Sequence, residues 1–197
     1  SLLAKYKLTE EQTNRDKHVQ RIKSSVINLN NILNEFLSIG KIEDGKIIAH
    51  FADFDIKEFI LQQCNEMTDI VKPGQVIHYS HEGKTLVNLD ENLFKNVLIN
   101  LLTNAAKFSA ENKPIYIATK VEDHQFRFTI KDEGIGISKK DQDHLFEIFF
   151  RGSNALNIPG TGLGLHIVGK YIEMMNGKIE VKSELNKGTE INLTFAQ

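Results

Sequence analysis

The sequence predicts an α+β protein, a two-layer α/β sandwich in which a mixed sheet carries helices on one face, preceded by a long helical segment. Two observations predict it. The first 40 residues place apolar side chains at steps of three and four. The remainder alternates helix-like and strand-like stretches without a regular βαβ rhythm. A chain of 197 residues is long enough for one well-buried domain plus an accessory element.

Composition narrows the class of protein. An apolar content of 41%, 25% charged residues and a net charge of −2 give no electrostatic bias toward nucleic acid or membrane. Cys64 is the only cysteine, which excludes a disulfide framework and a cysteine-based metal site. No apolar run approaches the roughly 20 residues of a membrane span, and the N-terminus lacks a signal-peptide layout. We expect a cytoplasmic protein, or the cytoplasmic portion of a larger and perhaps membrane-bound one.

The first helix is predicted to start at a capping box formed by Thr9 and Gln12 and to end at Gly40. Its apolar residues form a heptad seam, which one helix cannot bury alone. The seam could pack on the rest of the chain, but this strict pattern is more typical of a bundle, so we expect association between chains. The seam consists of Val19, Ile22, Val26, Leu29, Leu33 and Phe36.

After Gly45 the periodicity changes, and seven further elements or pairs of elements follow in order. Asp55 and Glu58 predict a capped helix that stops at Pro73 and Gly74. The remaining predictions are strands at 76–79 and 85–89, a helix at 90–107, strands at 115–121 and 126–130, a helix at 138–146, a helix at 163–175, and strands at 178–183 and 190–195.

The helix at 90–107 carries an unusual polar stripe. Its core face consists of Phe94, Val97, Leu98, Leu101, Leu102 and Ala105, and Asn96, Asn100, Asn104 and Lys107 lie opposite. A solvated face would explain one asparagine, but three are harder to dismiss because asparagine is a mediocre helix former. Asparagine oxygens can ligate Mg²⁺, and a lysine adds a point charge for phosphate.

Two glycine-rich turns are further candidates for ligand binding. Asp132 follows a strand and precedes Gly134 and Gly136, so the turn is either a plain connection or a slot in which a carboxylate accepts a hydrogen bond from adenine. In IPGTGLGLHIVG, Gly160, Gly162 and Gly164 precede a helix. Their spacing fits neither the dinucleotide fingerprint nor a Walker loop. They suit either an anion at the helix N-terminus or a mobile linker.

Taken together, the asparagine helix, D-x-G-x-G, LFEIFFR, G-T-G-L-G-L and K-G-T resemble the ATP-binding catalytic domain of sensor histidine kinases. That domain belongs to the GHKL superfamily shared with DNA gyrase, heat-shock chaperones and mismatch-repair ATPases. The resemblance covers roughly residues 51–197 with every motif in order. The heptad helix resembles the second helix of the dimerisation and histidine-phosphotransfer domain. The implied domains are residues 1–45, a partial dimerisation bundle, and 46–197, the ATP-binding domain.

The resemblance also implies site residues. Asn104 would bind Mg²⁺, while Asn100, Lys107 and Arg151 would act on the phosphates, although an exposed arginine is often only a solvated charge. Three aromatic residues, Phe146, Phe149 and Phe150, resemble the aromatic anchor of the lid, residues 151–159, with core packing the alternative. ATP or ADP would further contact Phe108, Asp132, Gly134, Gly136, Gly160, Thr161, Gly162, Leu163, Gly164, Leu165 and Thr189.

One feature departs from the family pattern. None of the seven histidines lies in the family's acceptor motif, and His18, on the heptad helix, is followed by valine. We expect the acceptor to lie upstream. The predicted function is a histidine kinase that binds Mg-ATP, pairs as a homodimer through its first helix and supplies phosphate to a response-regulator receiver domain. The alternatives are an anti-sigma-type serine kinase, which the heptad helix disfavours, and a nucleotide-binding module without kinase activity.

Overall fold

The computed structural model describes residues 12–67, 71–122 and 124–197. The chain divides into two compact units, Ser1–Asp44 and Gly45–Gln197. Helix α1, Gln12–Glu43, makes up the described part of the first unit. It continues through Gly40, so the predicted helix end was three residues too early, and Thr9 of the predicted capping box lies outside the described residues.

The apolar seam of α1 is uncovered. Its six side chains are between 37% exposed, at Val19, and 65% exposed, at Leu29. Leu37, beside the seam, is also 50% exposed. The helix therefore forms as its periodicity predicts, while the seam keeps its apolar surface in water in the single chain. None of the described helices is long and apolar enough to cross a lipid bilayer.

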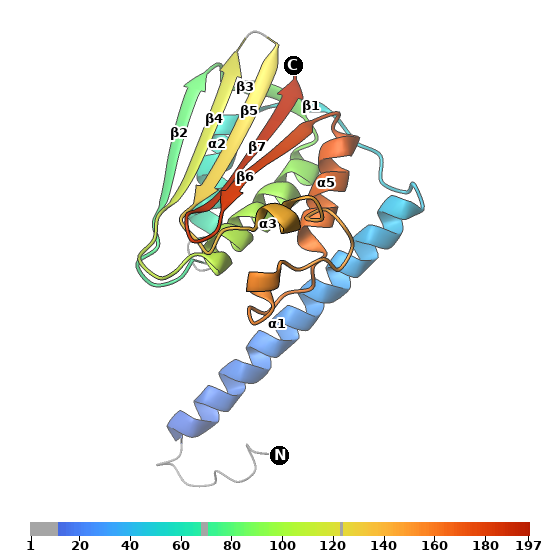
Figure 1. Ribbon diagram of the computed structural model, residues 1–197. Coiled ribbons are helices and arrows are strands. Elements are labelled where there is room, and N and C mark those ends of the chain that lie inside the picture. Colours follow the sequence, from blue (N-terminus) through green and yellow to red (C-terminus); the bar gives the residue numbers. More distant parts are fainter. Residues whose placement is uncertain (1–11, 68–70, 123) are drawn as a thin grey trace. The chain divides into compact units, whose positions relative to one another are not determined.

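The second unit is built on a five-stranded mixed sheet in the order β2-β4-β5-β7-β6 (Figure 1). β2 pairs with β4 in parallel, and the other pairs are antiparallel. A separate antiparallel pair joins β1 to β3. The strands are β1 (Ala52–Asp55), β2 (Ile77–Gly83), β3 (Leu86–Leu89), β4 (Ile115–Glu122), β5 (Gln125–Asp132), β6 (Lys178–Glu184) and β7 (Gly188–Ala196). The predicted α+β class is confirmed, and β1 was not predicted.

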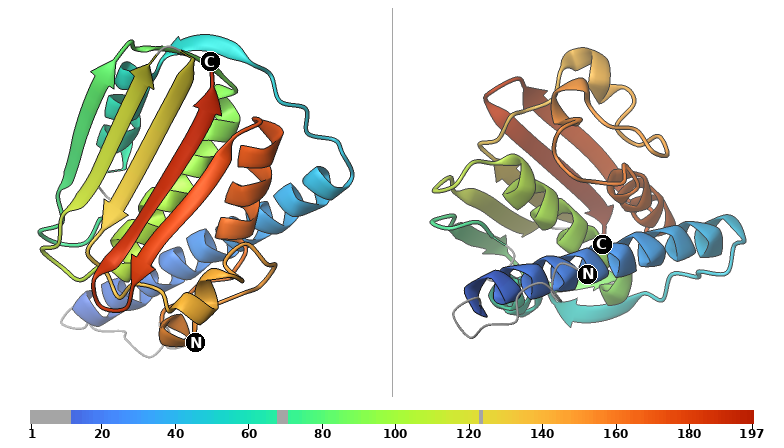
Figure 2. Two further views of the ribbon diagram at one scale, coloured as in Figure 1. Left: turned by 45° about the horizontal axis from the view of Figure 1, so that its top comes forward. Right: turned by 90° about the horizontal axis from the view of Figure 1, so that it is seen from below.

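Three helices cover one face of this sheet: α2 (Ile56–Glu66), α3 (Glu91–Phe108) and α5 (Gly164–Met174) (Figures 1 and 2). The side chains of Asp55 and Asp90 cap α2 and α3 by accepting the N–H groups of Glu58 and Leu93, each at 2.9 Å. Such caps satisfy helix donors that have no partner within the helix. They explain why these two helix starts could be placed from sequence.

Two predicted helix lengths were wrong. α2 ends at Glu66 instead of reaching Pro73, because the chain at 71–75 turns to contact the end of α3. α4 covers only Lys139–Gln142, and three-residue turns replace the rest of the predicted helix at 138–146. Ser138 caps α4 as expected for an N-terminal serine, accepting from the N–H of Asp141 at 3.1 Å.

The core is centred on Phe94 of α3, whose side chain is 0% exposed. Its ring contacts those of Phe59, Phe126, Phe128 and Phe195 at centroid distances of 5.6–6.0 Å. Burial of this cluster fixes the rotation of α3 about its axis. The apolar face of the helix points into the sheet as predicted, and the polar stripe consequently faces outward.

Candidate active site

The polar stripe of α3 meets the glycine loop that precedes α5. A Cβ added at Gly164 would lie 2.7 Å from Oδ1 of Asn100, and one at Gly160 would lie 2.5 Å from Nζ of Lys107. Both separations are shorter than side chains tolerate, so glycine at these positions makes room for the polar groups of α3. Segments more than 50 positions apart in the sequence thus form one surface.

Within the stripe, the side-chain amides have defined orientations. The Asn96 amide donates to the carbonyl of Asn92 at 2.8 Å, and the Asn100 amide donates to the carbonyl of Asn96 at 3.0 Å. The Asn100 amide nitrogen therefore bonds to the helix backbone through one N–H group, while its oxygen faces Gly164. Lys107 holds its ammonium 4.6 Å from the centroid of the Phe108 ring, a cation–π contact. Asn104 lies between Asn100 and Lys107 along the helix and is half-buried.

The glycine loop leaves the first turn of α5 without a side-chain cap. Gly162 has a φ of +78°, and a Cβ there would lie 2.7 Å from the carbonyl oxygen of Phe150. Thr161 accepts the N–H of Leu163 at 3.2 Å, and Leu163 is 2% exposed. Leu165 follows, half-buried, in the first turn of α5. Uncapped N–H groups at the positive end of a helix favour an anion.

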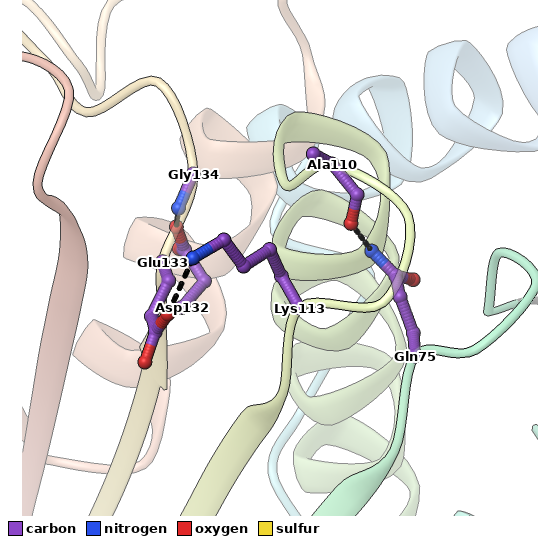
Figure 3. Close-up of polar contacts among 6 residues, drawn as sticks. All are labelled: Gln75, Ala110, Lys113, Asp132, Glu133 and Gly134. Atoms are coloured by element: carbon purple, nitrogen blue, oxygen red, sulfur yellow. Dashed lines mark hydrogen bonds and ion pairs between the residues drawn. The ribbon is translucent and has the colours of Figure 1, made fainter.

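Asp132, at the end of β5, is the buried carboxylate of the site, with an exposed fraction of 9%. Its Oδ1 accepts the N–H of Gly134 at 2.8 Å (Figure 3). Burial raises the pKa of this carboxyl, and backbone hydrogen bonds from Gly134 and Thr189, together with the nearby Ser109 hydroxyl, oppose the rise. Thr189 is also its register partner on β7.

The turn after Asp132 is packed between α3 and the β6–β7 turn. A Cβ at Gly134 would lie 2.6 Å from the carbonyl oxygen of Phe108, which also accepts the N–H of Ile135 at 3.2 Å. Gly136 has a φ of +64°, and a Cβ there would collide with the carbonyl of Glu184. The chain's own backbone therefore requires glycine at both positions, a reason that the sequence did not reveal.

The lid, residues 151–159, is held by its own hydrogen bonds. Arg151 donates through Nη2 to the carbonyls of Ala155 at 2.8 Å and Leu156 at 3.0 Å, and also to that of Ile158. Asn154 donates to the carbonyl of Gly136 at 2.9 Å. The short 3₁₀-helix Ser153–Ala155 lies within this segment. Arg151 is thus a structural part of the lid, not a merely solvated charge.

The aromatic residues before the lid differ in environment. Phe149 has a φ of +64° and is 64% exposed, so the core-packing alternative is wrong for this residue. A positive φ is uncommon for a residue other than glycine. Phe146 instead packs on α5, where a Cβ at Gly169 would lie 3.3 Å from its Cδ1.

Sequence reasoning missed two residues that fix the end of α3. Lys72 donates through Nζ to the carbonyls of Lys107 at 2.7 Å and Ser109 at 2.5 Å. Gln75 donates through Nε2 to the carbonyls of Ala106 at 3.1 Å and Ala110 at 3.0 Å (Figure 3). These groups satisfy carbonyls that the helix leaves open. No local pattern indicates such partners, since they come together only through the turn at Pro73 and Gly74.

Comparison with known proteins decides the family. Residues 89–197, more than half of the chain, match the family described as histidine kinase-, DNA gyrase B-, and HSP90-like ATPase. The chain belongs to this ATPase family. The match begins just before α3 and contains the polar stripe, the turn after Asp132 and the glycine loop, whereas Lys72 and Gln75 precede it.

The relatives of this ATPase domain are sensor histidine kinases. The sensor histidine kinase GacS of Pseudomonas protegens is 33% identical over 199 residues, covering 96% of this chain and 21% of that protein. The signal transduction histidine-protein kinase ArlS of Staphylococcus aureus is 29% identical, covering 83% of this chain and 41% of that protein. The chain thus spans about a fifth to two fifths of these relatives.

Solved structures agree on the fold. Full-length ShkA in complex with AMPPNP gives a TM-score of 0.79 at 26% identity, covering 98% of this chain and 40% of that one. The Acinetobacter baumannii histidine kinase AdeS gives 0.75 at 22% identity, covering 90% and 83%. ThkA in complex with the response regulator protein TrrA gives 0.68 at 22% identity, covering 91% and 50%.

Proposed function

We propose that this chain is the ATP-binding kinase portion of a sensor histidine kinase, which binds Mg-ATP and transfers the γ-phosphoryl group to a histidine. One observation carries the proposal: Asn100 and Lys107 converge with Gly164 and Gly160 at the uncapped start of α5. A cation, amide oxygens and free N–H groups at a helix N-terminus together suit a polyphosphate with its metal ion.

The adenine would lie at the other end of this surface. Asp132 offers a buried carboxylate oxygen that can accept a hydrogen bond from the exocyclic amine of the base. Phe108 and Thr189 border the same position, because Phe108 contacts Gly134 and Thr189 pairs with Asp132. Such recognition selects adenine over guanine, whose carbonyl at that ring position offers no donor.

The triphosphate would extend toward α5. Its oxygens would meet the N–H groups of the glycine loop and the Lys107 ammonium, and Asn104 would hold Mg²⁺ with water and phosphate oxygens completing the shell. Mg²⁺ would neutralise phosphate charge.

The chain's own contribution to transfer is positioning and charge neutralisation. Lys107 would oppose the charge of the phosphates, and the positive end of α5 would do the same from the other side. The relatives support this proposal in their names: ShkA was crystallised with AMPPNP, and ThkA with a response regulator. We therefore extend the proposal to relay from the phosphohistidine to the aspartate of a receiver domain.

The first helix would pair with its copy in a second chain. Its seam is exposed along its described length, and pairing with a copy would remove apolar surface from water. We propose that residues 1–45 form part of a dimerisation region and residues 46–197 the ATP-binding domain, acting in the cytoplasm. The division of the chain after Asp44 agrees with this boundary.

Phosphotransfer to a separately supplied acceptor helix tests the proposal. With γ-labelled Mg-ATP, a dimerisation fragment that carries the family's acceptor histidine should gain acid-labile phosphate slowly, since docking in trans forfeits effective concentration. This chain alone should stay unlabelled. Self-labelling that disappears in His18→Gln would instead make His18 the acceptor. Binding of Mg-AMPPNP without any transfer would favour a nucleotide-binding module that lacks kinase activity.

A further inference from the structure

The backbone carbonyls at the end of α3 are all hydrogen-bonded. Every backbone carbonyl from Ala105 to Ala110 accepts a hydrogen bond. Lys72 donates to the carbonyls of residues 107 and 109, and Gln75 donates to those of residues 106 and 110. The N–H of Ile135 donates to the carbonyl of residue 108, and the N–H of Ser109 to that of residue 105. Five of these six carbonyls are bonded by groups from other segments, so the end of the helix cannot shift without breaking several of these bonds.

One group in this segment is left without a bond. The hydroxyl oxygen of Ser109 is buried and makes no hydrogen bond of ordinary geometry, and the whole residue is only 1% exposed. Leaving a buried hydroxyl unbonded costs free energy, and such exceptions in native proteins call for a reason. The preceding carbonyl, that of Phe108, accepts the N–H of Ile135 at 3.2 Å, and a Cβ at Gly134 would lie 2.6 Å from that carbonyl oxygen and 2.8 Å from Oδ1 of Asp132. Ser109 therefore lies beside the turn that carries Asp132, and its hydroxyl lowers the pKa of that carboxyl.

We propose that Ser109 is a positioning residue for nucleotide binding, whose hydroxyl donates to the Asp132 carboxylate and keeps it aimed at the amine of the base. This proposal rests on the nucleotide-binding function proposed above. Asp132 would then receive the N–H of Gly134 on one side and the Ser109 hydroxyl on another, leaving a lone pair for adenine. Lys72 and Gln75 contribute by fixing the backbone on which Ser109 sits.

The charged groups around Asp132 do not replace this donor. Lys113 and Glu133 pair with each other at 3.1 Å beside it and are 49% and 38% exposed (Figure 3). The ammonium of Lys72 bonds to the backbone of Ser109. On the sheet, Asp132 faces Ile115 of β4 and Thr189 of β7, which carry no charge, and the neighbouring pair Lys131 and Glu190 belongs to the opposite face by strand alternation.

The pH dependence of binding follows with a defined sign. Burial raises the pKa of Asp132, and the Ser109 hydroxyl counteracts part of that rise. Adenine binding needs the ionised carboxylate, so affinity falls as the pH drops through the pKa of the free protein. Removing the hydroxyl raises that pKa further, so affinity is lost from a higher pH downward. Each unit of pKa difference gives up to about tenfold in affinity at the acid end.

The test is the dissociation constant of Mg-AMPPNP measured by calorimetry for the parent, Ser109→Ala and Ser109→Thr, at pH 8 and at one pH unit below the titration midpoint of Asp132 in the parent. Ser109→Ala should bind within about threefold of the parent at pH 8 and about threefold to tenfold more weakly than the parent at the lower pH. Ser109→Thr keeps the hydroxyl and should follow the parent. Ionisation of the nucleotide itself is common to all three and cancels in the ratio. Ser80→Ala, on the exposed face of β2, is the matched control.

A titration of the Asp132 carboxyl carbon by NMR gives a second measurement that needs no nucleotide. Ser109→Ala should raise the titration midpoint and should lower the melting temperature more above that midpoint than below it, because the hydroxyl favours the ionised carboxylate. An unchanged midpoint, or an affinity ratio that is the same at both pH values, overturns the role of Ser109 alone. Failure of the parent to bind Mg-AMPPNP at pH 8 overturns the proposed function and the inference with it.

Discussion

Replacing Gly164 by alanine separates two roles that glycine plays in the loop before α5. The new Cβ would lie 2.7 Å from Oδ1 of Asn100, the far end of a flexible side chain, so Asn100 must move. Moving it breaks the hydrogen bond from its amide to the carbonyl of Asn96, at 3.0 Å. The φ of Gly164 is negative, so alanine fits the backbone of this helical position.

The magnitudes predict a variant that folds but binds poorly. Alanine gains up to about 1 kcal/mol in helix propensity, and loss of a solvent-exposed amide bond costs about 0.5–1.5 kcal/mol. Stability should therefore change by less than about 1 kcal/mol. Loss of a hydrogen bond from the second N–H of the Asn100 amide to a charged phosphate costs about 1.5–3 kcal/mol of binding, which corresponds to about a 10- to 150-fold larger dissociation constant for Mg-AMPPNP.

Two matched glycines complete the experiment. Gly162→Ala places a side chain at a φ of +78° and 2.7 Å from the backbone of Phe150, which cannot move aside. It should cost about 2–3 kcal/mol and lower the melting temperature by about 4–12 °C. Gly169→Ala, in the interior of α5 and 3.3 Å from the Phe146 ring, controls for the helix effect. Equal nucleotide affinity in Gly164→Ala and Gly169→Ala would refute the reasoning.

Three further predictions concern the base, the lid and the first helix. Asp132→Asn should weaken Mg-AMPPNP binding at pH 7.5 by about 1–3 kcal/mol, because a donor then meets the adenine amine. Burial raises the pKa of Asp132, so its charge costs folding stability above that pKa. Urea unfolding should therefore show the variant at least as stable as the parent at pH 7.5, with the difference shrinking toward pH 4. Arg151→Ala should accelerate amide hydrogen exchange at residues 155–158, whose carbonyls lose a shared donor, and unchanged exchange would contradict the lid contacts. Leu33→Asp, at a seam position 52% exposed, should lower the sedimentation coefficient toward that of a monomer and leave nucleotide affinity unaltered, whereas a parent that is monomeric at every concentration would exclude the dimer.

The elements that could be predicted are those with a strong local signal. α3 and α5 combine an apolar stripe with a capping residue at one end. Asp90 caps the start of α3, and Asn176, with a φ of +55°, follows the end of α5. β1 was missed because ADFD carries two acidic residues in four and forms a strand only by pairing with β3. Its structure is a tertiary effect that local propensity does not contain.

The site divides in the same way. Motif spacing predicted a nucleotide site at the asparagines, Asp132 and the glycines, and the structure brings Asn100 and Lys107 beside Gly164 and Gly160. It could not identify Gln75, which is 6% exposed and acts through backbone carbonyls more than 30 positions away. Sequence also could not separate glycines that make room for polar groups, such as Gly160, from those that the backbone itself excludes from substitution, such as Gly136.

The hydrogen bonds of Arg151 limit how it could take part in phosphoryl transfer. Its guanidinium bonds to three carbonyls of the lid, so a contact with the γ-phosphate requires it to release at least some of them. The lid is partly exposed, and water can replace the arginine on those carbonyls, so the exchange costs little in desolvation. A phosphate dianion attracts a guanidinium more strongly than neutral carbonyls do. Binding of ATP would therefore loosen the lid's internal bonds while engaging Arg151, whereas ADP, which lacks the γ-phosphate, would leave those bonds in place.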